Sequence, residues 1–345
     1  MDTTHAGVEG VAVDRVTSWF AEYAPDAEPP LAIELIAGGH SNLTYTVTDA
    51  TDERWVLRRP PLGHVLATAH DMGREFRIIS ALQPTDVPVP PVVGLCQDDA
   101  VTGAPFYVMR FVDGRVARDP EAAALLSDDA RANAGIALVD VLARIHAVDP
   151  DAVGLGDLGR RERYVERQLR RWHAQWHQSK TRELALIDEV HDGLVSRVPP
   201  QGPATIVHGD YRLDNCIVDR AGGVRAVLDW ELCTLGDPLA DIGLLLVYWT
   251  EPDDRRPALL EPPTAIPGFA TRRQIAEFYA ERSGRDLSGI DYYVAFGYWK
   301  LACILEGVYE RYRAGVMREH EGWENFADRV VWLAESARDA LARLR

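Results

Sequence analysis

The 345-residue sequence predicts an α+β fold with two lobes, a β-rich lobe at residues 1–111 and a mainly helical lobe at residues 112–345. Between Leu31 and Phe111, short runs alternate between apolar and polar residues, as half-buried strands do. From about Glu121, apolar residues recur at the 3.6-residue spacing of helices. A chain of this length can also supply two lobes and a substantial core.

The first lobe is expected to contain a leading helix and five strands in an antiparallel sheet. The spacing of Val13, Val16 and Trp19 predicts a helix from Val8 to Tyr23. The run LAIELIAGGHSNLTYTVTDATDERWVLRRPP indicates three strands, and VPVPPVVGLC and PFYVMRFVDG indicate two more around the turn QDDAVTGA. The segment MGREFRIISALQ between them predicts a helix.

The second lobe is expected to be built from amphipathic and buried helices. These are DDARANAGIALVDVLARIHAVDP, RERYVERQLRRWHAQWHQSK, IGLLLVYW and DYYVAFGYWKLACILEGVYERYRAG. Tyr164, Gln168 and Trp172 share one helix face, which is either a wall for a substrate or ordinary packing. His146 is expected to make structural hydrogen bonds.

The segment Thr205–Gly243 carries the most specific pattern. It contains His-Gly-Asp at 208–210, then Asn215, and then Asp229 in the cluster VLDWE. The runs CIVD and VRAVLDW are joined by Arg-Ala-Gly-Gly, whose glycines suit a tight hairpin. This hairpin would return Asp229 to the neighbourhood of Asp210 and Asn215. Two carboxylates and a carboxamide are oxygen ligands of the kind that suit Mg²⁺.

The spacing Asp-x-x-x-x-Asn, with His two residues ahead, is that of the protein-kinase catalytic loop. The wording HGDxxxxN, followed by LDWE and GDPLAD, resembles the aminoglycoside phosphotransferase (APH) and choline kinase-like family of small-molecule kinases. With RRPPLG and HDMGRE upstream, it is most similar to the APH-like domains fused to acyl-CoA dehydrogenases. The resemblance implies a protein-kinase-like two-lobe fold. Its N-terminal lobe would bind nucleotide, and its C-terminal lobe would carry the catalytic and metal-binding loops and the acceptor pocket.

The resemblance also implies roles for individual residues. Asp210 would be the catalytic residue that accepts the proton of a substrate hydroxyl or orients that hydroxyl. Asn215 and Asp229 would hold Mg²⁺. Arg58 stands where kinases have Lys and would clamp the non-transferred phosphates, since Arg grips phosphate bidentately. Glu75 would pair with this arginine.

The other nucleotide-binding residues implied by the resemblance lie in a glycine-rich loop and at a hinge. In the loop at 37–43, Gly39, Ser41 and Asn42 would cover the phosphates, although an ordinary hairpin turn is an alternative. At the hinge, backbone groups of Arg110 and Val112 would face the adenine edge, with Met109 near the back of the pocket.

Three neighbours of these residues have more open roles. Period-two alternation places Arg58 and Arg59 on opposite faces of their strand, and Arg58 is the favoured phosphate ligand. His208 and Asp241 are expected to brace the catalytic loop. The role of Asp214 stays open.

The implied function is an ATP-dependent phosphotransferase that uses Mg²⁺ and transfers the γ-phosphoryl group to a small-molecule hydroxyl acceptor. GTP is an alternative donor. An aminoglycoside, a hydroxyacyl compound or hydroxyacyl-CoA, choline and homoserine all stay open as the acceptor. A nucleotide-binding pseudokinase and a metal-dependent hydrolase are the competing hypotheses. The hydrolase would leave the glycine-rich loop and Arg58 without a purpose.

Composition excludes several other classes. The formal net charge of −16 and the pI near 5.1 argue against a nucleic-acid partner, because such proteins carry basic patches. No apolar run approaches 18 residues, so no membrane partner is expected, and no signal peptide is visible. The four cysteines are scattered, which is typical of reduced residues in a cytoplasmic protein. The oligomeric state stays open.

Overall fold

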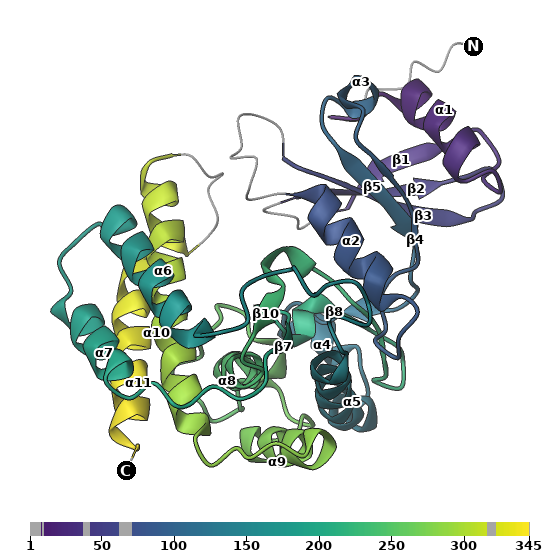
Figure 1. The fold of residues 1–345 in the computed structure, drawn as a ribbon. Helices are drawn as coiled ribbons and strands as arrows, with labels where there is room; N and C mark the ends of the chain where they lie inside the picture. Colours follow the sequence, from purple (N-terminus) through teal and green to yellow (C-terminus); the bar gives the residue numbers. More distant parts are fainter. Residues whose placement is uncertain (1–7, 9, 37–41, 62–70, 316–321, 345) are drawn as a thin grey trace. The chain divides into compact units, whose positions relative to one another are not determined.

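The structure is a computed structural model that describes residues 8, 10–36, 42–61, 71–315 and 322–344. The chain divides into two compact units. The first comprises Met1–Asp113 with Arg225–Glu231, and the second comprises Gly114–Val224 with Leu232–Arg345. The predicted α+β fold class is confirmed, because the first unit contains a five-stranded antiparallel sheet and the second is mainly helical (Figure 1).

The sheet of the first unit has the strand order β1-β2-β3-β5-β4, and every neighbouring pair is antiparallel. Its strands are β1 (Ala32–Leu35), β2 (Leu43–Thr48), β3 (Arg54–Arg59), β4 (Val92–Cys96) and β5 (Phe106–Arg110). The helices of this unit are α1 (Val13–Tyr23), α2 (Met72–Leu82) and the short α3 (Asp99–Thr102). Aromatic rings of α1 meet rings of the sheet edge-on: the ring centroids of Phe20 and Trp55 lie 5.7 Å apart, and those of Trp19 and Phe106 lie 5.2 Å apart. These contacts form the core of the unit.

Two helices of the first unit differ from the sequence prediction. Helix α1 begins at Val13 and not at Val8. Gly10 has a φ of +80°, a left-handed conformation that a right-handed helix cannot continue through. Helix α3 occupies the segment predicted as a plain turn, where the Asp98 side chain accepts a hydrogen bond from the backbone N–H of Ala100 and caps the helix.

The second unit packs its helices around α10 (Ile290–Arg313), which contacts α6, α8 and α11. The other helices are α4 (Pro120–Ala124), α5 (Asp128–Ala147), α6 (Tyr164–Ser179), α7 (Ala185–Val195), α8 (Leu239–Tyr248), α9 (Arg272–Ser283) and α11 (Phe326–Ala342). Tyr164 and Trp172 of α6 are buried in this core, so packing explains the shared face seen in the sequence. Among the helices of the described residues, none combines the length and apolarity needed to cross a lipid bilayer.

Short strands in the second unit flank the turn that carries His-Gly-Asp at residues 208–210. They are β6 (Arg115–Val116), β7 (Thr205–Val207), β8 (Cys216–Val218) and β10 (Thr234–Gly236); β9 (Val224–Val227) begins where the chain passes to the first unit. Strands β7 and β10 pair antiparallel. In the tight turn between β8 and β9, Asp219 accepts hydrogen bonds from the backbone N–H groups of Ala221 and Gly223, and Gly222 has a φ of +83°. The predicted tight turn is therefore present.

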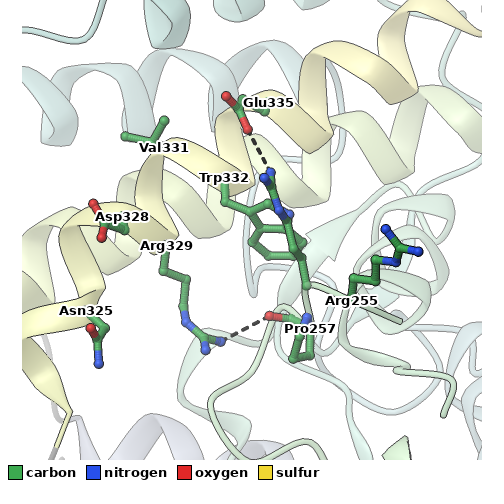
Figure 2. A pocket seen from close by; sticks show the side chains of 9 residues that line it. Arg255, Pro257, Asn325, Asp328, Arg329, Val331, Trp332 and Glu335 are labelled. Carbon is green, nitrogen blue, oxygen red and sulfur yellow. Dashed lines mark hydrogen bonds and ion pairs between the residues drawn. The ribbon is translucent and has the colours of Figure 1, made fainter. Parts of the chain in front are cut away.

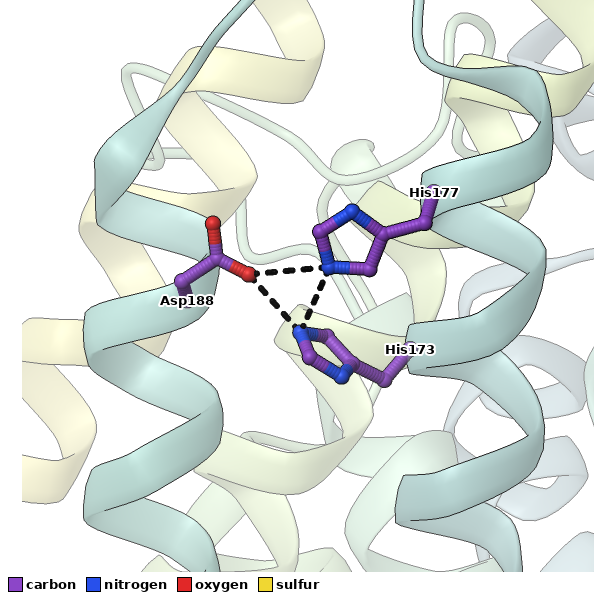
Figure 3. A group of neighbouring side chains, drawn as sticks. All are labelled: His173, His177 and Asp188. Atoms are coloured by element: carbon purple, nitrogen blue, oxygen red, sulfur yellow. Dashed lines mark hydrogen bonds and ion pairs between the residues drawn. The ribbon is translucent and has the colours of Figure 1, made fainter.

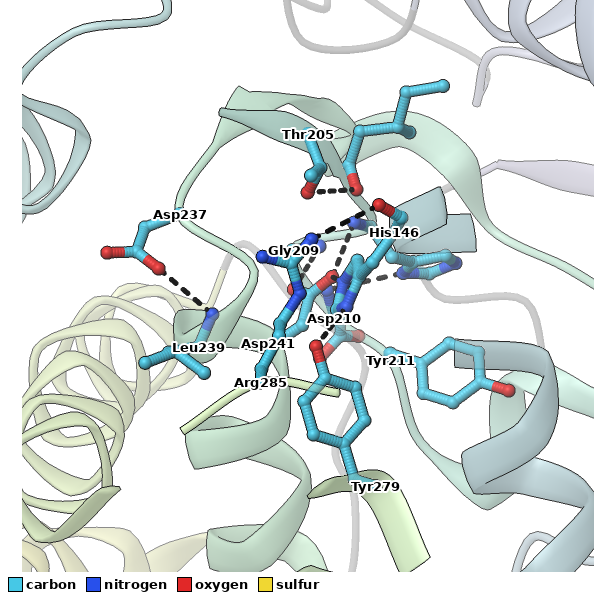
Figure 4. A network of polar contacts seen from close by, with 12 residues as sticks. His146, Thr205, Gly209, Asp210, Tyr211, Asp237, Leu239, Asp241, Tyr279 and Arg285 are labelled. Carbon is cyan, nitrogen blue, oxygen red and sulfur yellow. Dashed lines mark hydrogen bonds and ion pairs between the residues drawn. The ribbon is translucent and has the colours of Figure 1, made fainter. Parts of the chain in front are cut away.

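A buried carboxylate braces the turn that follows β7 (Figure 4). Asp241, in the first turn of α8, is 1% exposed. Its Oδ2 accepts a hydrogen bond from the backbone N–H of His208 at 2.7 Å, and its Oδ1 accepts one from Gly209 at 2.9 Å. Gly209 has a φ of +86°, and a Cβ there would lie 2.8 Å from the carbonyl oxygen of Leu232. Glycine at 209 therefore permits both the turn and the close approach.

The same carboxylate is held from behind by His146. His146 Nε2 lies 3.2 Å from Asp241 Oδ2, and His146 Nδ1 lies 2.7 Å from the hydroxyl of Tyr279. Burial lowers the pKa of His146, although hydrogen bonding to Asp241 opposes the shift. A neutral ring can donate from Nε2 to the carboxylate while Nδ1 accepts from Tyr279, so every polar atom of the group is paired.

We predict that Asp241→Asn loosens this turn. An amide has one acceptor oxygen, so one of the two backbone N–H groups would face an NH₂ group and lose its partner. Loss of one hydrogen bond to a charged group should lower the free energy of unfolding by about 3 kcal/mol. Urea denaturation measures this change, and amide hydrogen exchange at His208 and Gly209 should accelerate. Asp192→Asn, at an exposed side chain of α7, is the matched control. Unchanged exchange at both amides would contradict the assignment.

Candidate functional site

In the second unit, the braced turn presents Asp210 to Asn215. Asn215 ends a 3₁₀ turn, Leu213–Asn215, and its Nδ2 donates to the backbone oxygen of Asp210 at 2.8 Å and to Asp210 Oδ2 at 3.1 Å. Because the amide nitrogen is engaged in this way, Oδ1 is the atom of Asn215 that can face a cation. The Asp-x-x-x-x-Asn spacing thus produces a direct contact between the two side chains.

The other oxygen of Asp210 contacts a residue that sequence reasoning missed. The hydroxyl of Tyr248, at the end of α8, donates to Asp210 Oδ1 at 2.9 Å. Burial, together with the charge of Asp210, raises the pKa of Tyr248 well above its ordinary value, so it remains a donor at neutral pH. Tyr248 follows Asp241 by seven residues, two helical turns, and this spacing could have revealed that both lie on one face of α8.

Arg212 accompanies the same carboxylate. Its Nε lies 3.7 Å from Asp210 Oδ2, and its Nη2 lies 2.9 Å from Asp214 Oδ2. The guanidinium also lies 5.0 Å from the centre of the Tyr248 ring. Asp214, whose role the sequence left open, therefore forms an ion pair with Arg212, which lies between it and Asp210.

Lys300 is a second residue that sequence reasoning missed. Its Nζ donates to the carbonyl oxygen of Gly209 at 2.9 Å, and the residue is 6% exposed. Burial lowers the pKa of Lys300, while the charges of Asp210 and Asp241 oppose that shift. A signal was available in the composition, because only two of the 37 basic residues are lysines and this one stands in an otherwise apolar and aromatic helix segment.

In the first unit, Arg58 joins two carboxylates. Its Nε lies 3.1 Å from Glu75 Oε2, and its Nη2 lies 2.9 Å from Asp229 Oδ1. Burial acts to lower the pKa of Arg58, but the charges of Glu75 and Asp229 outweigh burial and raise this pKa above its ordinary value. The guanidinium therefore stays charged. Arg59 points elsewhere, since its Nη1 donates to the carbonyl oxygens of Thr102, at 2.7 Å, and Gly10. Of the two arginines, Arg58 is the one beside the predicted metal ligand.

The backbone of Asp229 is unusual. Its φ is +63°, a left-handed conformation that non-glycine residues adopt at a cost of roughly 1–3 kcal/mol. The flanking backbone is fixed, because Val227 N–H donates to Pro88 O at 2.9 Å and Trp230 Nε1 donates to Val227 O at 3.1 Å. Residues whose strained backbone is held by the surrounding structure are common at functional sites.

The residues predicted to form the hinge lie at or just after the end of β5. Met109 is 7% exposed and is paired in the sheet with Val56. The backbone N–H of Arg110 donates to Pro91 O at 2.7 Å, so this N–H is committed within the first unit. Phe111 N–H donates to Arg54 O, at the start of β3, at 3.1 Å. Val112 is the next residue along the chain.

Two of the predicted phosphate-loop residues, Gly39 and Ser41, lie outside the described residues. Asn42, at the end of that loop, is described and is 2% exposed. Neither Nδ2 nor Oδ1 of Asn42 has a hydrogen-bond partner among the described residues. Buried amides are normally paired, so this side chain is suited to a polar ligand.

These groups fit a magnesium-bound nucleotide by their chemistry. Asn215 Oδ1 and the carboxylate of Asp229 are hard oxygen donors of the type that Mg²⁺ takes together with phosphate oxygens. The guanidinium of Arg58 and the amide of Asn42 can both contact phosphate oxygens. By its chemistry, each of the four side chains can therefore contact either a magnesium ion or a phosphate oxygen.

A cavity of about 500 Å³ lies elsewhere in the second unit, beside α11 (Figure 2). It is lined by Arg255, Arg256, Pro257, Asn325, Asp328, Arg329, Val331, Trp332 and Glu335. Arg256 Nη1 lies 3.0 Å from Glu335 Oε2, and Arg329 Nη1 donates to Pro257 O at 3.1 Å. Two of its arginines are thus paired within the wall, and none of the predicted site residues lines it.

The chain is similar in sequence to proteins of a known family. A phosphotransferase enzyme family (APH) model matches residues 32–278. Acyl-CoA dehydrogenase family member 10 from Mus musculus is 36% identical over 291 residues, which is 83% of this chain and 27% of that protein. The chain spans between 27% and 43% of the length of the curated relatives it matches.

Solved structures agree with this match. A candidate aminoglycoside phosphotransferase from Ralstonia eutropha superimposes with a TM-score of 0.80 and 31% identity, covering 96% of this chain and 98% of that one. A ternary complex of aminoglycoside phosphotransferase APH(4)-Ia with ADP and hygromycin B has a TM-score of 0.60 at 14% identity, covering 94% and 97%, and supports the fold alone. The predicted kinase-like fold and the predicted resemblance are both confirmed, and the chain belongs to the APH phosphotransferase enzyme family.

Proposed function

We propose that the protein is an ATP-dependent phosphotransferase that transfers the γ-phosphoryl group to a hydroxyl of a small molecule. The observation that carries this proposal is the Asp210–Asn215 contact on a turn braced by Asp241, in a chain of the APH family. Phosphoryl transfer needs positioning and charge stabilisation more than covalent participation by the protein. A fixed carboxylate next to a cation ligand supplies both.

In the proposed reaction, the substrate hydroxyl oxygen forms a bond to the γ-phosphorus while the bond between the γ-phosphorus and the β,γ-bridging oxygen breaks. ADP leaves, and Asp210 takes the hydroxyl proton. The carboxylate has about four lone-pair positions, and the hydrogen bonds from Tyr248 and Asn215 occupy two of them. Positions therefore remain for the hydroxyl.

In the proposal, the nucleotide is bound through a magnesium ion and an arginine. Asn215 and Asp229 would bind Mg²⁺, which neutralises phosphate charge when it is bound. Arg58 would contact the non-transferred phosphates, and Glu75 would orient its guanidinium. In this proposal, residues 1–111 form the nucleotide-binding lobe and residues 112–345 carry the acceptor pocket.

The remaining nucleotide contacts in the proposal come from the loop and the hinge. Gly39, Ser41 and Asn42 would cover the phosphates with backbone and amide groups. Backbone groups at the end of β5, with Val112 N–H among them, would face the adenine, because the Arg110 N–H is already engaged. ATP is the favoured donor, and GTP is the alternative to test.

Two acceptor classes have a specific observation behind them. The curated relatives are named as acyl-CoA dehydrogenases, which favours a hydroxyacyl compound or hydroxyacyl-CoA as the acceptor. The similar solved structures are named as aminoglycoside or macrolide phosphotransferases, which favours an antibiotic. A screen of ATP consumption should therefore include hydroxyacyl-CoAs, aminoglycosides, macrolides, choline and homoserine, with GTP as a second donor.

We predict that Asp229→Ala removes magnesium-dependent turnover with whichever acceptor the screen identifies. Loss of a charged group that acts on the phosphates should lower the turnover rate by roughly 10²–10³-fold or more. Radiolabel transfer from the γ-phosphate measures the rate, and circular dichroism verifies folding. Asp253→Ala, at an exposed position, is the matched control and should keep full turnover. Normal turnover in a folded Asp229→Ala protein would refute the kinase proposal, and nucleotide binding without turnover in the unmodified protein would favour a pseudokinase.

We further predict that Asp210→Asn separates chemistry from nucleotide binding. The variant should bind magnesium-bound ATP as well as the unmodified protein does, because Asn215 and Asp229 remain. Its single-turnover rate should fall by roughly 10²–10⁴-fold, the range for loss of a general base. Calorimetry measures the affinity, and rapid quenching measures the rate.

Tyr248→Phe is the comparison variant for Asp210→Asn, since it removes one hydrogen bond to the carboxylate and leaves the carboxylate itself. It should slow turnover by roughly tenfold, because a hydrogen bond to a charged group contributes at least about 1.5 kcal/mol. If Asp210→Asn lost affinity and rate together, Asp210 would be a metal ligand and the assigned roles would be wrong.

A further inference from the structure

Two histidines and an aspartate converge between helices α6 and α7 of the second unit (Figure 3). His173 and His177 stand four residues apart on one face of α6, and Asp188 lies in the first turn of α7. One oxygen of Asp188 lies 2.7 Å from His173 Nε2 and 3.3 Å from His177 Nε2, and the two ring nitrogens lie 3.1 Å apart. Three ligand atoms thus face one another at short range.

The spacing of these atoms fits a metal ion. Zinc binds imidazole nitrogen and carboxylate oxygen at about 2.0–2.2 Å with tetrahedral geometry, which places neighbouring ligand atoms roughly 3.3 Å apart. The two contacts made by His177 are close to that value, and the contact between His173 and Asp188 would lengthen by a few tenths of an ångström when an ion enters. No movement of the helices is required for such a change.

The cluster is also held in place by its neighbours. The ring of His191 stacks on that of His173, with centroids 3.8 Å apart and an interplanar angle of 6°. The connection between α6 and α7 is anchored on the fully buried Glu306, whose Oε1 accepts from Thr181 N–H at 2.7 Å and whose Oε2 lies 3.1 Å from Arg182 Nη1. Ligands on two helices joined by a fixed connection keep their geometry, which favours binding of an ion.

Charge and access favour a cation at this position. The carboxylate of Asp188 faces both imidazole nitrogens and brings a negative charge to them at neutral pH, as an aspartate ordinarily does. Lys180 also lies near this carboxylate, but its charge is paired, because its Nζ lies 2.8 Å from Glu183. The side chains of His177 and Asp188 are 44% and 45% exposed, which gives an ion a path from solvent and leaves room for water as a further ligand.

We infer that His173, His177 and Asp188 form a binding site for a divalent transition-metal cation of the zinc type. Two imidazoles and one carboxylate select zinc, cobalt or nickel over magnesium, which prefers an all-oxygen set. The site is therefore chemically distinct from the magnesium site proposed at Asn215 and Asp229. An ion here would join α6 to α7 and stabilise this part of the helical unit.

The experiment uses the full chain without an affinity tag, freed of metal with a chelator. Titration calorimetry with Zn²⁺ should show about one site per chain, and Co²⁺ should give the visible absorption bands of a tetrahedral complex. His177→Asn and Asp188→Asn each remove one ligand. Their affinity for Zn²⁺ should fall by more than the roughly 10–100-fold that loss of an outer-shell partner costs.

His191→Asn is the matched control, because His191 contacts the His173 ring and offers no ligand atom to the cluster. It should keep the stoichiometry and lose at most roughly tenfold in affinity. The double variant His173→Asn/His177→Asn leaves the other eight histidines of the chain in place. The inference is overturned if this double variant binds Zn²⁺ as the unmodified protein does, or if the unmodified protein binds none. Circular dichroism excludes unfolding as the reason for a loss.

Discussion

The arrangement of the second unit depends on one buried carboxylate, that of Asp241. It accepts hydrogen bonds from two consecutive backbone N–H groups, which hold the turn after β7 and thereby position Asp210. The same helix carries Tyr248 to the other oxygen of Asp210. A carboxylate buried to this degree is stable only because each oxygen is hydrogen-bonded and His146 lies against it. The position of Asp210, the proposed catalytic residue, is therefore fixed by Asp241 and Tyr248.

In the first unit, the main electrostatic feature is the buried positive charge of Arg58. Arg58 is surrounded by acidic groups, and its charge is compensated by Glu75 and Asp229. Strand alternation decides which arginine takes this position, because Arg59 is directed to the opposite face and to the carbonyl oxygens of Gly10 and Thr102. In the proposed function, magnesium would compete with Arg58 for Asp229, and the Arg58–Asp229 ion pair would hold that carboxylate in place before the ion binds.

The sequence predicted the parts of the fold and site that depend on local pattern. Strand alternation predicted the five-stranded sheet, and the spacing of Asp210 and Asn215 predicted two side chains in direct contact. Tyr248, Lys300 and the cluster of His173, His177 and Asp188 were missed, because each meets its partner only when segments separated in the sequence pack together. The start of α1 was also wrong, since the effect of Gly10 on the backbone outweighed an apolar spacing that extended to Val8.

The hydrogen bonds to Asp210 bear on how this residue can act. Donors already occupy positions on both of its oxygens, and Arg212 lies near one of them, so its orientation is determined before any substrate binds. In a loose transition state for phosphoryl transfer, the hydroxyl proton is lost late and little basic strength is required early. In the proposed reaction the acceptor first needs alignment with the γ-phosphorus, and a carboxylate hydrogen-bonded at both oxygens would supply that alignment with little loss of side-chain entropy. Under the proposed function, Asp210 would therefore orient the hydroxyl early in the reaction and accept its proton late.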